Sequence, residues 1–280
     1  MPNPSRYAEV REVVKSMKVH TICDSAQCPN IWECWGRGTA TFMILGEVCT
    51  RACRFCAVRS GDPDGALDNE EPMRVAEAVH DLRLKHVVIT SVTRDDLQDG
   101  GADHYSRTVR HVHRMSPETN VELLIPDMGG DRRALQIVVA SGAKVIGHNL
   151  EVVERLQEEV RDSRASYRRS LQVLKDIKEL EPTVLTKTSL MLGLGESTEE
   201  VMEAMAHARS VGVDIITIGQ YLKPRGGSLR VRSYISPERF DEFGRTAQRM
   251  GFRSVFSGPM VRSSYHADSV MITDSEPGGN

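Results

Sequence analysis

The chain has no cysteine after residue 56, although it runs to residue 280. It has no apolar run near the roughly 18 residues that a membrane-spanning helix needs. Its first residues mix acidic and basic side chains, which argues against a secretory signal or an acid-poor transit peptide. A net charge of −3 gives no basic excess for nucleic acid or membrane surfaces. We therefore expect a cytoplasmic protein that binds neither nucleic acid nor membranes.

Aromatic residues are few, at 5%, but 40% of the residues are hydrophobic and 27% are charged. This composition is ordinary for a globular protein. A length of 280 residues is enough for one large domain or two small ones with a sizeable core.

The six cysteines form two triplets within residues 23–56. Cys49, Cys53 and Cys56 have C-x3-C-x2-C spacing, and the earlier triplet has C-x4-C-x5-C spacing over Cys23, Cys28 and Cys34. A disulfide framework is typical of small secreted chains, so this clustering favours metal binding.

The spacing of the cysteines distinguishes between two kinds of metal site. Structural zinc sites usually pair C-x2-C motifs and take four protein ligands, a pattern that neither triplet has. A four-iron cubane takes one thiolate per iron, so three cysteines leave one iron open to another ligand. The spacing therefore favours two iron–sulfur clusters over zinc.

Strand and helix patterns alternate through the middle of the chain. Helical apolar spacing occurs over 74–83 and 167–177 and around Leu135, and helices are expected to start at Ser197 and at Ser236-Pro237. The expected strands are 41–46, 86–92, 121–126, 144–148, 184–192 and 214–219. This alternation predicts an α/β fold with a parallel sheet, either doubly wound and open or a partial barrel.

The C-x3-C-x2-C spacing of the second triplet resembles the signature of the radical S-adenosylmethionine superfamily, and its position after the strand-like run 41–46 strengthens the resemblance. The resemblance implies a partial (β/α)6 barrel, similar to part of a TIM barrel, with the site at the carboxyl ends of the strands. It also implies a [4Fe–4S] cluster on Cys49, Cys53 and Cys56, whose open iron binds S-adenosylmethionine.

Further motifs resemble the lipoyl synthase family over about residues 18–268. The first triplet is one, and Arg262-Ser-Ser-Tyr-His-Ala267 near the end is another. The others are Thr93-Arg-Asp-Asp-Leu97, Asp99-Gly-Gly-Ala102, His148-Asn-Leu-Glu151, Met191-Leu-Gly-Leu-Gly-Glu196 and Gly219-Gln-Tyr-Leu222.

That resemblance implies insertion of two sulfur atoms at carbons 6 and 8 of a protein-bound octanoyl-lysine. The sulfur would come from a second, sacrificial [4Fe–4S] cluster, and each insertion would use one S-adenosylmethionine. The implied partners are an octanoylated lipoyl domain of a 2-oxoacid dehydrogenase or a glycine-cleavage H protein, a flavodoxin or ferredoxin electron donor, and an iron–sulfur carrier.

The resemblance also divides the chain and assigns ligands. Residues 1–40 would be an extension that carries the auxiliary ligands, 41–224 the barrel, and 225–280 a second extension. The auxiliary cluster would be held by Cys23, Cys28 and Cys34 with a serine as fourth ligand, for which Ser264 is preferred to Ser263. Without the resemblance, the sequence around these serines indicates only a polar turn.

Several residues are candidates for contact with S-adenosylmethionine, each with a structural alternative. Asn149 and Glu151 could bind the ribose or could simply end a strand. Gly193 and Gly195 could admit the adenosine or serve a tight strand–helix junction. The full candidate set is Thr90, Ser91, Asn149, Glu151, Gly193 and Gly195. Lys187, within an apolar strand, could face the barrel lumen near the substrate or be structural.

Three other functions stay open. A different radical sulfur-inserting enzyme would share the second triplet but would not be expected to carry the first triplet with the terminal Arg-Ser-Ser-Tyr. An electron carrier with two clusters would not consume S-adenosylmethionine. A zinc-stabilised binding module would lack the brown colour of an iron–sulfur protein.

Overall fold

The computed structural model describes residues 3–225, 227–265 and 267 of the chain. Its centre is an eight-stranded sheet in the order β1-β2-β5-β6-β7-β8-β9-β10. Every neighbouring pair is parallel except β1 with β2, which is antiparallel. The strands of this sheet are β1 (His20–Thr21), β2 (Thr41–Ile44), β5 (His86–Ser91), β6 (Asn120–Leu124), β7 (Val145–Gly147), β8 (Leu185–Leu192), β9 (Ile215–Gln220) and β10 (Ser254–Gly258).

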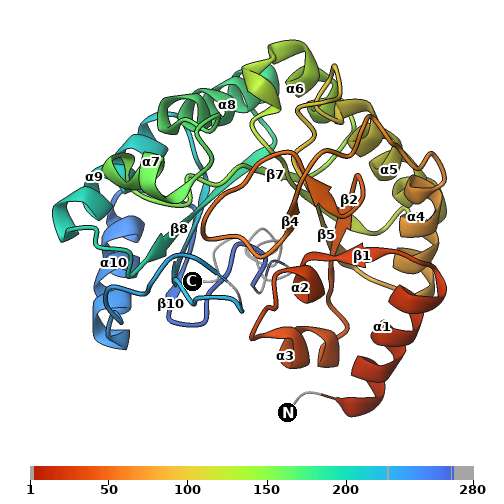
Figure 1. Ribbon diagram of the computed structural model, residues 1–280, viewed down its shortest axis with the longest axis horizontal. Coiled ribbons are helices and arrows are strands. Elements are labelled where there is room, and N and C mark those ends of the chain that lie inside the picture. The colour runs from red at the N-terminus through yellow and green to blue at the C-terminus, as the bar shows by residue number, and fades with distance from the viewer. Residues whose placement is uncertain (1–2, 226, 266, 268–280) are drawn as a thin grey trace, which may run out of the picture.

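Helices cover the outside of the sheet and form an arc around the strands (Figure 1). They are α4 (Glu71–Asp81), α5 (Ala102–Met115), α6 (Arg132–Val139), α7 (Gln157–Val160), α8 (Tyr167–Leu180), α9 (Thr198–Ser210) and α10 (Pro237–Arg249). Two 3-10 turns, η1 (Met128–Gly130) and η2 (Glu154–Leu156), also lie in these connections. Because β1 and β10 are the two edges of the sheet, the barrel is open between them.

The helices form where the sequence supplies caps and an apolar face. Ser197 and Glu200 make a complete capping box at the start of α9. The Ser236 side chain caps α10, which has Pro237 at its first position. The expected inner face of α4 is buried against the sheet, with Val75, Ala78, Val79 and Leu82 all inaccessible to solvent.

The N-terminal extension lies beside the open edge of the barrel. It contains α1 (Pro4–Ser16), α2 (Ile22–Ser25) and α3 (Ile31–Gly36), which Figure 1 places together near the N-terminus. The strand β1 joins this extension to the barrel through two residue pairs with β2, His20 with Met43 and Thr21 with Phe42. A small separate sheet pairs β3 (Val48–Cys49) with β4 (Arg59–Ser60).

The predicted α/β partial barrel is confirmed, and each of the six expected strands is present as β2 and β5 to β9. Two strands of the eight-stranded sheet were not expected from the sequence. The strand β10 extends the parallel sheet beyond residue 224, and β1 adds an antiparallel strand at the other edge. Among the described residues, no helix has the length and apolar character needed to cross a membrane.

Candidate functional site

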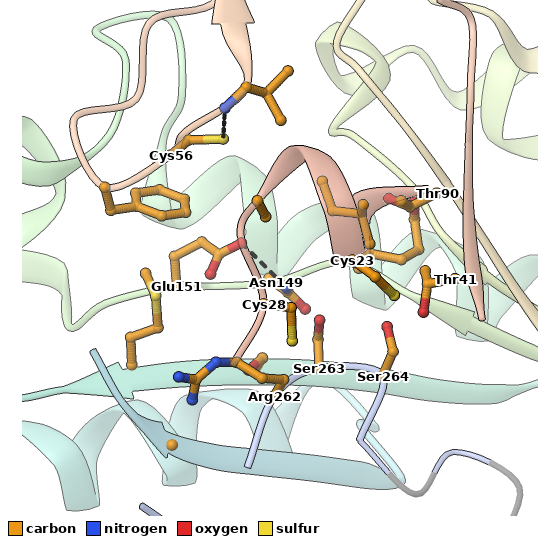
Figure 2. A pocket seen from close by; sticks show the side chains of 18 of the residues that line it. Cys23, Cys28, Thr41, Cys56, Thr90, Asn149, Glu151, Arg262, Ser263 and Ser264 are labelled. Atoms are coloured by element: carbon orange, nitrogen blue, oxygen red, sulfur yellow. Dashed lines mark hydrogen bonds between the residues drawn. The ribbon is translucent and has the colours of Figure 1, made fainter. Parts of the chain in front are cut away.

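A single cavity of about 560 Å³ is lined by all six cysteines. The side chains come from the N-terminal extension, the loops after the strands and the segment after β10 (Figure 2). The structure therefore brings together two triplets that the sequence could only place in order. None of the six thiols forms a disulfide.

In the second triplet, Cys49 ends β3, and Cys53 and Cys56 follow on the loop between β3 and β4, at the carboxyl ends of the barrel strands. Backbone N–H groups donate to the sulfur of each cysteine. Cys49 Sγ accepts from Arg51 and Thr93 at 3.4 Å, Cys56 Sγ from Val58 at 3.4 Å, and Cys53 Sγ from Asp162 at 3.3 Å. Such bonds favour thiolate, and they tune the potential of an iron–sulfur cluster.

Arg51 anchors this loop to the barrel. Its buried guanidinium contacts Asp127, after β6, at 2.7 Å and Asp95, after β5, at 2.8 Å. Burial alone would raise the pKa of Asp127, but the hydrogen bonds and charge of Arg51 lower that pKa to about 2. Asp127 is therefore ionised at neutral pH and holds the arginine firmly. Sequence reasoning missed Arg51, although its position between Cys49 and Cys53 was a signal.

The first triplet comes from two short helices and the turn between them. Cys23 is on α2, Cys34 is on α3, and Cys28 is in the connection. Burial, and to a smaller extent the charges of Cys23 and Cys28, raise the pKa of Cys34 to about 12. Burial also raises the pKa of Cys23, although contacts from Thr41 and Trp35 oppose it. A buried thiol of this kind ionises only when a cation or a metal centre compensates the charge of the thiolate.

The donor set of the cavity fits iron–sulfur clusters. All six cysteines are free thiols. A cubane takes one thiolate at each iron. Each triplet can therefore supply three of the four ligands of one cubane and leave one iron for another ligand.

The segment after β10 brings both candidate serines into the same cavity. Ser263 and Ser264 lie in a turn closed by the N–H of Tyr265, which donates to Arg262 O at 3.0 Å. Figure 2 shows both hydroxyls pointing into the cavity, near Cys28 and Cys23. The serines therefore line the same cavity as the three cysteines of the first triplet.

Gly219 on β9 lets this segment approach the barrel. A Cβ atom at Gly219 would lie 2.1 Å from Val261 O, a distance that real Cβ contacts essentially never show. The sequence motif that contains Gly219 thus has a packing reason, which is close contact between two backbone segments.

Four of the six candidate contacts for S-adenosylmethionine line the cavity, namely Thr90, Ser91, Asn149 and Glu151. Asn149 Nδ2 donates to Glu151 Oε1 at 3.0 Å, as Figure 2 shows. Glu151 has a φ of 68°, which is rare for a residue with a side chain and is typical of functional sites. Burial raises the pKa of Glu151, while Arg161 opposes that shift.

Gly193 and Gly195 are not among the residues that line the cavity. Both have positive φ, and a Cβ at Gly193 would lie 2.4 Å from Ser233 O. At Gly195 the nearest atom would be Arg232 Cδ at 2.8 Å. This packing matches the alternative of a tight strand–helix junction, and a role in binding the adenosine stays a prediction.

Two buried polar groups support the barrel, and one of them, His148, lines the cavity. His148 Nδ1 pairs with Ile125 O and its Nε2 with Ser170 Oγ, both at 2.9 Å. Burial, together with the charge of Arg161, lowers the pKa of His148 to about 4. Lys187 forms an ion pair with Glu122 at 2.7 Å, with both side chains 3% exposed. Of its two expected roles, this contact matches the structural one.

Comparisons with known proteins agree with this geometry. The family model described as the radical SAM superfamily matches residues 43–219. A protein named lipoyl synthase from Deinococcus radiodurans is 53% identical, over 97% of this chain and 82% of that protein. Proteins of the same name from Thermus thermophilus and Pyrobaculum calidifontis are 50% and 56% identical, over 97% and 95% of this chain and 84% and 92% of theirs.

Solved structures resemble the fold at low sequence identity. Methylornithine synthase aligns with a TM-score of 0.57 and 13% identity, covering 98% of this chain and 94% of its own. The FeFe-hydrogenase maturase HydG from Carboxydothermus hydrogenoformans aligns with a TM-score of 0.61 and 10% identity, over 97% of this chain and 79% of that one. At such identities the likeness extends to the fold alone.

Proposed function

This chain belongs to the lipoyl synthase family of the radical S-adenosylmethionine superfamily, and we propose that its two cysteine triplets divide that reaction between two clusters. The enzyme inserts two sulfur atoms into a protein-bound octanoyl chain, with S-adenosylmethionine and [4Fe–4S] clusters as cofactors. The observation that carries the proposed division is that both triplets line one cavity.

The target C–H bonds at carbons 6 and 8 are unactivated, so no side chain of the protein can deprotonate them. S-adenosylmethionine at a reduced cluster supplies a 5′-deoxyadenosyl radical, which can take a hydrogen atom from such a carbon. The protein's own contribution is to position the reacting groups and to exclude water around them.

We assign the cluster that binds S-adenosylmethionine to Cys49, Cys53 and Cys56. Each of these sulfurs accepts a backbone N–H, and Arg51 fixes their loop on two strand ends. The three thiolates leave one iron for the amino acid part of the cofactor. Thr90, Ser91, Asn149 and Glu151 line the cavity beside this loop and are the proposed contacts of that cofactor.

We assign the auxiliary cluster to Cys23, Cys28 and Cys34, with Ser264 as its fourth ligand. An alkoxide is a harder ligand for iron than a thiolate and is displaced more easily. That property suits a cluster whose iron must leave when its sulfur is used. The position of the serine turn beside Cys23 and Cys28 supports this assignment (Figure 2).

The cavity wall is largely apolar. Val88 of β5, Leu124 and Ile125 at the end of β6, and Leu190 of β8 line it. An apolar wall suits the octanoyl chain and holds few groups that could react with a radical.

The substrate of this enzyme is an octanoyl chain attached to a protein. We propose that the carrier is a lipoyl domain or a glycine-cleavage H protein, that a flavodoxin or ferredoxin supplies electrons, and that an iron–sulfur carrier rebuilds the auxiliary cluster. The division into 1–40, 41–224 and 225–280 is also a proposal, and residues 268–280 lie outside the described part of the chain. A cytoplasmic location stays a prediction.

A pair of single-cysteine variants tests the proposed division. Anaerobically reconstituted protein would be mixed with dithionite, S-adenosylmethionine and an octanoyl-lysine peptide, and mass spectrometry would follow 5′-deoxyadenosine and sulfur addition. Cys28→Ala should make 5′-deoxyadenosine without adding sulfur. Cys53→Ala, the matched control in the other triplet, should make neither product.

Other outcomes would reject specific parts of the proposal. Sulfur addition by Cys28→Ala would show that the first triplet is not the sulfur source. Production of 5′-deoxyadenosine by Cys53→Ala would overturn the assignment of the second triplet. Absence of both products from wild-type protein with both clusters loaded would favour the electron-carrier function.

A further inference from the structure

The two ends of the described chain meet at the auxiliary site through two side-chain contacts. The Tyr265 hydroxyl lies 3.1 and 3.3 Å from the two carboxylate oxygens of Glu33 and donates to that carboxylate. The Asn30 amide Nδ2 donates to Met260 O at 2.7 Å, and Asn30 is buried. These pairs join residues 232 and 230 positions apart in the sequence.

Each of these contacts lies next to a proposed ligand. Glu33 immediately precedes Cys34, and Tyr265 immediately follows Ser264. Asn30 lies between Cys28 and Cys34, while Met260 begins the segment that leads to the serine turn. The contacts therefore connect the backbone that carries the cysteines with the backbone that carries the serines.

The serine turn has a different attachment on its other side. Arg262 Nη1 donates to Gln220 O at 3.3 Å and to Val261 O at 2.7 Å. Gly219 allows Val261 to lie directly on β9. The barrel thus supports one side of the turn, and the N-terminal extension supports the other through Tyr265 and Asn30.

We propose that Tyr265, Glu33 and Asn30 are positioning residues that hold the serine turn against the first cysteine triplet and so complete the auxiliary site. We call these two contacts, Tyr265 with Glu33 and Asn30 with Met260, the latch. The proposal rests on the proposed function, in which Ser264 is the fourth ligand of the auxiliary cluster.

A latch is needed because the ligands come from separate segments. A ligand set must be held within about 0.5 Å of its working geometry, and a surface turn alone does not provide that precision. A hydrogen bond from a hydroxyl to a carboxylate is stronger than one between neutral groups. It can also break and re-form without covalent change, which suits a site that loses its cluster and must be filled again.

The test measures how fast iron leaves each cluster of the reconstituted holoenzyme. Release to a coloured chelator would be followed without oxygen, with S-adenosylmethionine present to occupy the other cluster. Tyr265→Phe removes only the hydroxyl, and Tyr234→Phe is the matched control, because the Tyr234 side chain is largely exposed. Spectra of the reduced protein with and without S-adenosylmethionine would identify which cluster remains.

Tyr265→Phe should release auxiliary iron about tenfold faster than wild type, the ratio expected for loss of one hydrogen bond to a charged group. The cluster on the second triplet should keep its spectrum and its rate of iron loss. Glu33→Gln, which keeps an acceptor oxygen, should be intermediate, and Tyr234→Phe should match wild type.

Ser264→Ala separates failure of the latch from failure of the ligand assignment. Fast release from Ser264→Ala with wild-type release from Tyr265→Phe would overturn the latch alone. Wild-type release from both variants would reject Ser264 as a ligand and the latch with it. Equal acceleration at both clusters of Tyr265→Phe, together with a lower melting temperature, would show a general structural role and overturn the proposal.

Discussion

The two cysteine triplets line the same cavity but are supported differently. Arg51 ties the loop of the second triplet to two barrel strand ends, through the fully buried Asp127 and the partly exposed Asp95. The first triplet is on the N-terminal extension, where Cys23 contacts Thr41 of β2, and the hydrogen bonds of Tyr265 and Asn30 join its segment to the segment that carries the serine turn. One site is thus held by the barrel and its loops, whereas the other is assembled from two segments far apart in the sequence.

This difference matches what each proposed cluster must do. A cluster that repeatedly cleaves a cofactor benefits from a rigid loop with a constant environment. A cluster that supplies its own sulfur must be dismantled and replaced, so its ligands must be able to separate. Under the proposed assignment, the same fold would provide one permanent site and one renewable site. The following predictions test that contrast, from the largest expected effect to the smallest.

Removal of the buried arginine should have the largest effect. Arg51→Met leaves Asp127 without its main partner, and loss of one member of a buried ion pair costs about 3–5 kcal/mol of unfolding free energy. The second-triplet loop should lose its anchor, so 5′-deoxyadenosine formation should disappear while the auxiliary iron is retained. Denaturant unfolding, iron content and product analysis measure these effects.

The matched control is Arg168→Met, because Arg168 makes an exposed ion pair with Glu154. Exposed pairs contribute about 0–1 kcal/mol, so this variant should behave like wild type. Normal 5′-deoxyadenosine formation by Arg51→Met would show that the barrel does not fix the loop.

The buried pair Lys187–Glu122 should contribute to the free energy of unfolding but should not affect either cluster. Lys187→Met leaves a buried carboxylate and should lower the unfolding free energy by about 3–5 kcal/mol. The double variant with Glu122→Leu should recover most of that loss, because two apolar side chains replace the pair. Iron content per folded chain should not change. If one cluster were lost selectively, the Lys187–Glu122 pair would instead have a role in the site of that cluster.

Acid should weaken the barrel beneath the second triplet. The folded pKa of His148, about 4, lies below its ordinary value of 6.5. The neutral imidazole therefore contributes stability above about pH 6.5, and that contribution is lost as the pH falls from 6.5 towards 4. The shift corresponds to about 3 kcal/mol at most. Unfolding curves of apoprotein across this range should show the loss, and His148→Gln should flatten it.

The smallest expected effect is at Gly219, where the segment that carries the serine turn contacts β9. Gly219→Ala places a methyl group 2.1 Å from Val261 O, and overpacking of this kind costs about 1–3 kcal/mol. The turn should shift, so auxiliary iron should fall before the other cluster is affected. Gly258→Ala is the control, because its Cβ would meet Val261 at an ordinary 3.5 Å. Equal auxiliary iron in both variants would contradict the role of Gly219.

Local patterns were sufficient for the barrel. The strands β5, β8 and β9 are buried at nearly every position, as parallel strands covered on both faces are, and Ser197 with Glu200 marks a helix start. The sheet also contains β10, residues 254–258, which pairs with β9. This strand was not expected, because all five of its residues are half-buried and its sequence has no clear buried face. The choice between an open sheet and a partial barrel came from the family resemblance, because alternation alone is the same for both.

The sequence by itself determined the chemistry of this protein, because cysteine spacing and strand–helix alternation are local properties that survive without a fold. Only the tertiary structure decided which groups meet. It placed the serine turn beside Cys23 and Cys28, joined Tyr265 to Glu33, and paired Arg51 with Asp127. These contacts join residues far apart in the chain, and no local pattern encodes them, because they exist only after the barrel has folded and its two extensions have docked.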